Sequence, residues 1–265
     1  MSRETLRPPR WYVISLRPSD EHEDLRHIAA QYGGALIALS PWSIRTENTP
    51  SARVALAAAL SAPQVLATSP NAVRALRDLR AHDLRNTREL PVFPRSAQQW
   101  FAVGAATAAE LNELGIDDVI APERMDSEGL LALPQLQNFD GTAIGLLTAP
   151  GGRGVLAPAL QARGARVLRA DIYVREPTVL GRIEVARVIG LDAPAVLVLS
   201  SGEALQRVLA QLPAQAIERL RGARVSAASE RLAALARELG FADVVVAAGP
   251  SAAQLLAGYG ERDRD

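Results

Sequence analysis

Short apolar runs alternate with amphipathic segments along most of the chain. The apolar runs predict strands at residues 11–16, 35–39, 64–68, 100–103, 143–147, 166–173, 195–199, 224–226 and 244–247. The amphipathic segments predict helices at residues 19–32, 70–79, 107–114, 127–136, 154–163, 202–211, 230–239 and from 251 on. Regular alternation of this kind is typical of an α/β fold with mainly parallel sheets.

An internal repeat appears when the strand–helix units are compared. The paired units are 13–37 with 144–168, 65–79 with 196–209, and 101–120 with 224–245. A repeat of this size predicts two similar α/β domains with a cleft between them. The repeat alone favours consecutive halves, 1–125 and 140–265.

Two extended segments interrupt this alternation, at residues 40–45 and 170–175. Each follows a strand of the first repeat unit and ends in an arginine. We interpret them as connections between the domains, where hinge motion is the default expectation.

Composition narrows the class of protein. The 265 residues, 48% of them hydrophobic, are enough for two domains. Lys+Arg and Asp+Glu are both 29, and this balance disfavours a general nucleic-acid binder. With no apolar run of about 20 residues and no signal-like N-terminus, we expect a soluble, cytoplasmic protein.

Cysteine and histidine usage limits the chemistry further. The absence of cysteine excludes disulfides, thiolate metal sites and cysteine nucleophiles. The three histidines are His22, His27 and His82, and none has partners at metal-ligand spacing. We therefore predict no metal centre and interpret all three as surface residues.

Small hydroxyl or glycine residues end several predicted strands just before a helix, at residues 68–70, 104–107, 150–153, 200–202 and 226–229. Helix N-termini present unpaired N–H groups and positive dipole ends, so several together would bind a polyanion at the carboxyl ends of the strands. The alternative is ordinary capping. Ser69 followed by Pro70 fits an N-cap, and Thr107 with Glu110 fits a capping box.

Other motifs give weaker signals. Residues 151–154 lack both the Lys-Ser/Thr of a phosphate loop and the glycine spacing of a dinucleotide fingerprint, which disfavours a nucleotide-dependent transferase. Arg17, Arg153 and Arg175 follow strands or connections and are candidates for bidentate pairing with carboxylates. No paired acids or Ser-His-Asp arrangement is recognisable, so hydrolase chemistry has little support.

A series of short motifs resembles one known family. The motifs are LRPSD, ATSPNAV at 67–73, VGAATAAEL at 103–111, SEGL at 127–130, the Gly-Gly-Arg loop and Tyr-x-Arg connection within 149–176, Ser-Ser at 200–201 and Ser-Glu-Arg at 229–231. In this order, from about Val13 to Leu256, the chain resembles the uroporphyrinogen-III synthases. It departs from them at Leu16, where many members have threonine, and at Ala105, where proline is common.

The resemblance implies a fold of two similar doubly wound parallel-sheet domains joined by two extended connections, with a cleft between them. One domain would be contiguous, at 42–171, and the other would combine 1–41 with 172–265. The implied reaction needs no cofactor. It dehydrates and cyclises the linear tetrapyrrole hydroxymethylbilane, inverting ring D through a spiro intermediate.

The resemblance also implies roles for individual residues. Tyr173 would assist departure of the hydroxyl, with Thr107 as a second catalytic residue. Substrate carboxylates would be bound by Arg17, Thr68, Ser69, Gly152, Arg153, Ser200, Ser201 and Ser229. We expect a monomer that makes transient contact with hydroxymethylbilane synthase and has no nucleic-acid or membrane partner. The alternative function is that of a non-catalytic bilobed protein that binds a small anionic ligand.

Overall fold

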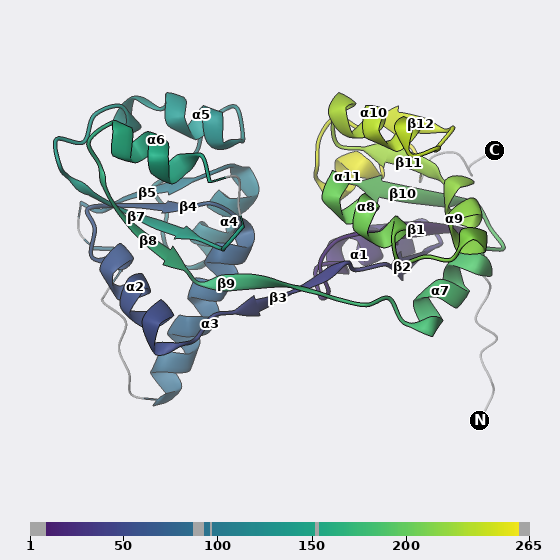
Figure 1. Cartoon of the computed structure of the whole chain (residues 1–265), viewed down its shortest axis with the longest axis horizontal. Helices are drawn as coiled ribbons and strands as arrows, with labels where there is room; N and C mark the ends of the chain where they lie inside the picture. The colour runs from purple at the N-terminus through teal and green to yellow at the C-terminus, as the bar shows by residue number, and fades with distance from the viewer. Residues whose placement is uncertain (1–8, 87–92, 96, 152–153, 260–265) are drawn as a thin grey trace. The chain divides into compact units, whose positions relative to one another are not determined.

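The computed structural model describes residues 9–86, 93–95, 97–151 and 154–259 (Figure 1). The chain divides into two compact units. Unit 1 combines the residues up to Ser43 with those from Glu176 on, and unit 2 runs from Ile44 to Arg175. The chain therefore passes from one unit to the other after Ser43 and after Arg175. The family resemblance places these two boundaries at 41/42 and 171/172.

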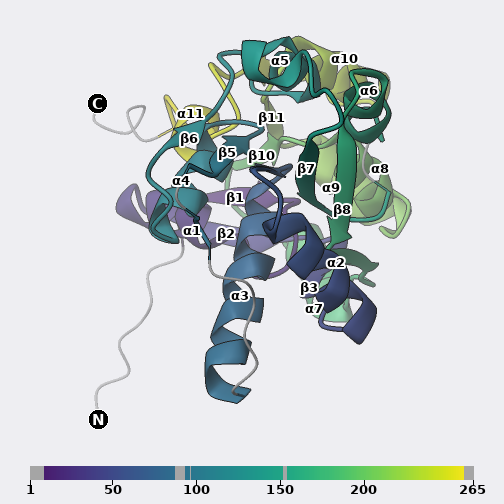
Figure 2. The same ribbon diagram turned by 90° about the vertical axis from the view of Figure 1, so that its left-hand side faces the viewer.

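Unit 2 contains a five-stranded parallel sheet in the order β6-β5-β4-β7-β8. Its strands are β4 (Gln64–Ala67), β5 (Gln99–Ala102), β6 (Val119–Ile120), β7 (Ala143–Thr148) and β8 (Arg166–Asp171). Its helices are α2 (Pro50–Leu60), α3 (Pro70–Asn86), α4 (Ala105–Glu113), α5 (Ser127–Ala132), the 3₁₀ turn η1 (Pro134–Leu136) and α6 (Leu156–Ala162). Helices α5 and α6 cover one face of this sheet, and α2 and α3 cover the other (Figures 1 and 2).

Both faces of this sheet are buried, which explains why its strands read as continuous apolar runs. Trp100 packs with the helices on one face, and its neighbour Phe101 packs on the opposite face. Val65 and Leu66 divide between the two faces in the same way. Gly145 of β7 lies so close to α2 that an added Cβ would stand 2.2 Å from the carbonyl oxygen of Ala59.

Unit 1 contains a second five-stranded parallel sheet, in the order β12-β11-β10-β1-β2. Its strands are β1 (Trp11–Ser15), β2 (Gly34–Ala38), β10 (Ala195–Leu199), β11 (Arg224–Ala227) and β12 (Val244–Val246). Its helices are α1 (Glu23–Gln31), α7 (Arg182–Ile189), α8 (Gly202–Leu209), α9 (Ala214–Arg221), α10 (Glu230–Glu238) and α11 (Ala252–Leu255). Helices α1 and α11 contribute to the core on one face, around Trp11 and Val13.

The sequence repeat accounts for the strand order of both sheets. When repeat partners are matched, β12-β11-β10-β1-β2 has the same order as β6-β5-β4-β7-β8. The N-terminal strand β1 pairs with β10, more than 180 residues away in sequence, and not with a strand of unit 2. A division into consecutive halves is therefore wrong.

The two segments predicted to be extended are strands β3 (Trp42–Thr46) and β9 (Tyr173–Pro177), which pair in a two-stranded sheet. Both boundaries between the units fall within these strands. The predicted fold class, two similar α/β domains with parallel sheets and two extended connections, is confirmed.

Three helices, the two-residue strand β6 and some boundaries differ from the prediction. Helices α2, α7 and α9 were not predicted, although Thr49 and Pro50 give α2 an ordinary capped start. The predicted helix at 127–136 ends early because Leu133 is extended before Pro134. Within the described ranges, no helix is long and apolar enough to cross a membrane.

Candidate functional site

A cavity of about 210 Å³ lies in unit 2 beside the carboxyl ends of β4, β7 and β8. Its polar lining comes from Thr68, Ser69, Ser127, Thr148, Arg169, Tyr173 and Arg175. Parallel α/β sheets bind ligands at this edge, because the loops after the strands and the N-termini of the following helices meet there.

Tyr173 and Ser69 meet at this cavity. The Tyr173 side chain is 3% exposed and packs in the core cluster that contains Leu76 and Ile172. Its phenol oxygen lies 2.9 Å from Ser69 Oγ, and Ser69 Oγ accepts a hydrogen bond from the Ala72 N–H at 3.2 Å. The ring is therefore held by packing, and its hydroxyl by the residue that precedes α3.

A second pair of hydroxyls joins the ends of β4 and β7. Thr68 Oγ1 lies 3.1 Å from the Leu147 carbonyl oxygen and 3.0 Å from Thr148 Oγ1. Thr148 follows Thr68 by 80 residues in sequence, so no local pattern marks it as a member of this site.

Two arginines bring positive charge to the cavity lining. The Arg169 guanidinium pairs with the Asp171 carboxylate at 2.9 Å and also donates to the Ala149 carbonyl oxygen at 3.2 Å. Its side chain remains 41% exposed, although its Nε and Nη2 groups already donate to Asp171. Arg169 was missed from the sequence because it lies inside a strand, whereas Arg175 was identified as a candidate.

The predicted site residues Thr68, Ser69 and Tyr173 are thus brought together, whereas Thr107 is not among the described residues that line this cavity. Thr107 is 1% exposed in the first turn of α4. The predicted capping box is wrong, because Gly104 is the N-cap and Glu110 pairs with Arg74 and Arg77.

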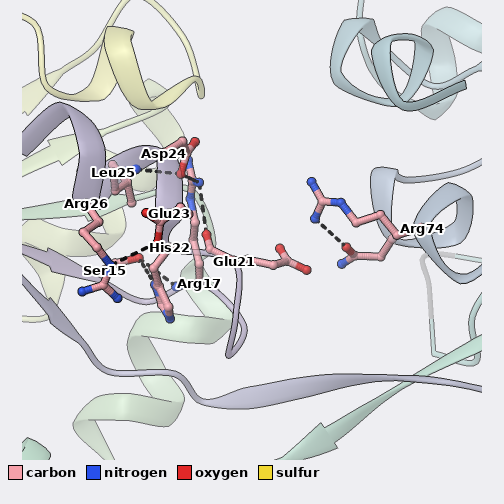
Figure 3. A network of polar contacts seen from close by, with 10 residues as sticks. Ser15, Arg17, Glu21, His22, Glu23, Asp24, Leu25, Arg26 and Arg74 are labelled. Carbon is pink, nitrogen blue, oxygen red and sulfur yellow. Dashed lines mark hydrogen bonds and ion pairs between the residues drawn. The ribbon is translucent and has the colours of Figure 1, made fainter. Parts of the chain in front are cut away.

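The other predicted binding residues lie in unit 1 or outside the described ranges. Ser201 and Ser229 are the N-caps of α8 and α10, and Ser200 is the exposed residue before Ser201. Arg17 pairs with Asp24 at 2.6 Å (Figure 3). Gly152 and Arg153 are outside the described residues.

The prediction that His22 is a surface residue is wrong. Its side chain is 6% exposed, with Nδ1 2.9 Å from Ser15 Oγ and Nε2 2.8 Å from Ser40 Oγ. Figure 3 shows the contact with Ser15 at the start of α1. The surrounding charges in the sequence concealed this burial, because the hydroxyl partners come from the ends of β1 and β2.

Burial lowers the pKa of His22 below its ordinary value, and the positive charges of Arg17 and Arg26 lower it further. Asp20 and Asp24 oppose this shift. The folded state therefore holds the ring neutral at a pH where the unfolded chain binds a proton.

We expect His22 to make unfolding depend on pH. Below the ordinary pKa of 6.5 the unfolded state binds a proton that the folded state does not, so stability falls as the pH falls. The slope cannot exceed about 1.4 kcal/mol per pH unit, the limit for one proton. Urea unfolding of the protein and of His22→Gln at a series of pH values measures it. Equal slopes for both proteins between about pH 7 and about pH 5 would contradict the assignment.

No group of three or more histidine or acidic side chains placed to hold a metal ion occurs among the described residues. The polar groups at the cavity are hydroxyls, helix N–H groups and arginines. This set suits binding of carboxylates and donation of one phenol proton.

Comparison with known proteins gives a consistent result. The family model HEM4, uroporphyrinogen-III synthase HemD, matches residues 23–257. The uroporphyrinogen-III synthase of Escherichia coli K12 is 33% identical over 242 residues, which cover 89% of this chain and 94% of that protein. The Salmonella typhimurium enzyme of the same name is 40% identical over 165 residues, or 62% of this chain and 65% of that protein.

Solved structures agree at the level of the fold. A uroporphyrinogen III synthase mutant from the extreme thermophile Thermus thermophilus has a TM-score of 0.59 at 22% identity, covering 94% of this chain and 96% of that chain. Uroporphyrinogen-III synthetase from Helicobacter pylori has a TM-score of 0.56 at 15% identity, covering 92% and 96%. With the family model spanning most of the sequence, the chain belongs to the uroporphyrinogen-III synthase family.

Proposed function

We propose that this protein converts hydroxymethylbilane into uroporphyrinogen III, a lyase reaction of tetrapyrrole biosynthesis. Beside family membership, the observation that carries the proposal is the Tyr173 phenol, fixed by Ser69 at the carboxyl edge of the unit 2 sheet. Two arginines line the same cavity.

The substrate suits such a site because it carries acetate and propionate side chains on all four rings. Carboxylates would be bound by the Arg169 guanidinium and by the N–H groups in the first turn of α3 that follow Pro70. Thr68 and Ser69 line the same cavity, and they would contact substrate beside these donors while their hydroxyls stay bonded within unit 2. Closure without the enzyme gives the non-inverted isomer, so the enzyme must control geometry more than supply strong acids or bases.

The first chemical step requires a proton donor for the leaving hydroxyl. The bond between the terminal methylene carbon and its hydroxyl breaks, and the electron pair leaves with the oxygen. The Tyr173 phenol gives that oxygen a proton, so water departs, and the proton lost by the pyrrole nitrogen restores the phenol. The product of this step is the azafulvene, which the substituted carbon of ring D attacks to form the spiro intermediate.

Unit 1 offers a second set of binding groups. We propose that Ser200, Ser201, Ser229 and Arg17 bind carboxylates, together with Gly152 and Arg153 of unit 2. The Ser201 and Ser229 hydroxyl oxygens accept hydrogen bonds from the backbone N–H groups of Ala204 and Leu232. Each hydroxyl can therefore donate its own proton to a carboxylate. Arg17 would release its partner Asp24 and bind a substrate carboxylate instead. The Thr107 side chain is 1% exposed, so Thr107 would reach substrate only if the first turn of α4 opened.

The test is incubation with freshly prepared hydroxymethylbilane, followed by oxidation and chromatographic separation of the type I and type III uroporphyrin isomers. We expect predominantly type III product, with type I alone in the control without enzyme. Type I alone in both samples would favour the alternative, a binding protein for a small anionic ligand.

A further inference from the structure

Ser69 occupies two structural roles at once. As the residue before Pro70, it accepts the Ala72 N–H at 3.2 Å, the ordinary contact of a helix N-cap. The same oxygen lies 2.9 Å from the Tyr173 phenol oxygen, which comes from β9, 104 residues later. An N-cap needs only the first contact, so the second calls for its own explanation.

Counting donors leaves two arrangements for the hydroxyl protons of Ser69 and Tyr173. The Ala72 N–H can only donate, so Ser69 Oγ accepts it. Ser69 and Tyr173 each have one hydroxyl proton, and one of the two lies between their oxygens. If Ser69 donates, the backbone N–H, the serine hydroxyl and the phenol form one directed chain, and the phenol proton is left for the cavity.

Two physical effects favour this direction. Accepting a hydrogen bond polarises the Ser69 hydroxyl and makes it a better donor. The oxygen also sits at the positive end of α3, a helix of 17 residues, where increased negative charge on nearby oxygens is stabilised.

We propose that Ser69 is a positioning residue, whose hydroxyl donates to the Tyr173 oxygen and thereby directs the phenol proton into the cavity. This inference rests on the proposed function of Tyr173 as the proton donor to the leaving hydroxyl. As the phenol proton departs, the negative charge that develops on the oxygen remains hydrogen-bonded to Ser69. The helix N-terminus therefore contributes to this step through Ser69.

The chain offers a matched control for the capping role. Thr49 precedes Pro50 and accepts the Ala52 N–H at 3.3 Å, so residues 49–52 repeat the local structure of residues 69–72 within the same unit. Thr49 is outside the residues that line the cavity. Glycine is tolerated at N-cap positions at a cost of only a few tenths of a kcal/mol, so Ser69→Gly and Thr49→Gly should both fold.

Steady-state kinetics of type III formation test the proposal. We expect Ser69→Gly to lower kcat about tenfold and to leave KM within about twofold of the value for the unchanged protein. Thr49→Gly should change kcat and KM by no more than about twofold. Ser69→Thr, which restores the hydroxyl, should recover activity to within about threefold. In a Tyr173→Phe background, Ser69→Gly should cost less than about twofold, because its effect acts through the phenol.

Equal losses from Ser69→Gly with and without the Tyr173 hydroxyl would overturn the proposal, since Ser69 would then act on substrate directly. Equal effects of Ser69→Gly and Thr49→Gly would also overturn it. Ultraviolet resonance Raman difference spectra, protein minus Tyr173→Phe, report the hydrogen bond without turnover. A Tyr173 signal indicating an accepted hydrogen bond, lost in Ser69→Gly, supports the proposal, and an unchanged signal contradicts it. The spectra test the hydrogen bond between Ser69 and Tyr173 independently of turnover. Absence of type III product would refute the proposed function and not this hydrogen bond.

Discussion

Tyr173→Phe is expected to lower kcat for type III product by about two orders of magnitude, the lower end of what one general acid contributes. The phenylalanine ring refills the space in the core, where Tyr173 is 3% exposed, so the fold should persist. KM should change little, because the phenol acts on the leaving hydroxyl as the carbon–oxygen bond breaks. Stopped assays with separated isomers measure both constants. The type I fraction should rise at limiting enzyme, since spontaneous closure then competes with a slower catalysed reaction.

Tyr12→Phe is the matched control for losing a phenol hydroxyl. Tyr12 is half-buried in unit 1, and its hydroxyl donates to Asp192 at 2.9 Å in an exposed hydrogen bond, so its removal should leave both constants within about twofold. An unchanged rate and isomer ratio in Tyr173→Phe would refute the role of the phenol in hydroxyl departure.

The strands could be predicted well because their environment is uniform. Both faces of each sheet carry helices or core side chains, so segments such as residues 195–199 are apolar throughout and bounded by polar turns. The repeat then matched strands in the two units, although periodicity carries no information on which strand lies beside which. The resemblance anticipated that β1 joins the C-terminal half of the chain, but its pairing with β10 is a long-range contact that was not predicted.

Much of the site depends on contacts of the same long-range kind. Ser69 and Tyr173 were both identified from the motifs, but their 2.9 Å contact was not. Thr148 and Arg169 lie at a strand end and within a strand, without a motif to mark them. His22 has charged neighbours in sequence, so its burial could not be read from local composition.

A buried ion pair in unit 2 leads to the second large expected effect. Arg53 of α2 pairs with Asp83 of α3, and their side chains are 14% and 6% exposed. The Arg53 guanidinium also contacts His82 Nδ1 at 3.1 Å and donates to Asn48 Oδ1 at 2.6 Å. We expect Asp83→Ala to lower the free energy of unfolding by about 3 kcal/mol, because it leaves the Arg53 charge enclosed without its partner. Urea unfolding followed by circular dichroism measures this loss.

Two further variants separate the charge from the packing. Arg53→Met with Asp83→Leu replaces both charges with apolar groups and should bring stability back to within about 1 kcal/mol of the original, since apolar replacement of a buried pair is often neutral. Glu203→Ala removes one partner of the exposed pair with Arg207, whose side chains are 57% and 45% exposed, and should cost less than about 0.5 kcal/mol. If the double variant were as unstable as Asp83→Ala, the loss would come from packing of α2 against α3. Recovery in the double variant would instead identify the unpaired charge as the cause, and would mean that the ion pair itself adds little net stability to unit 2.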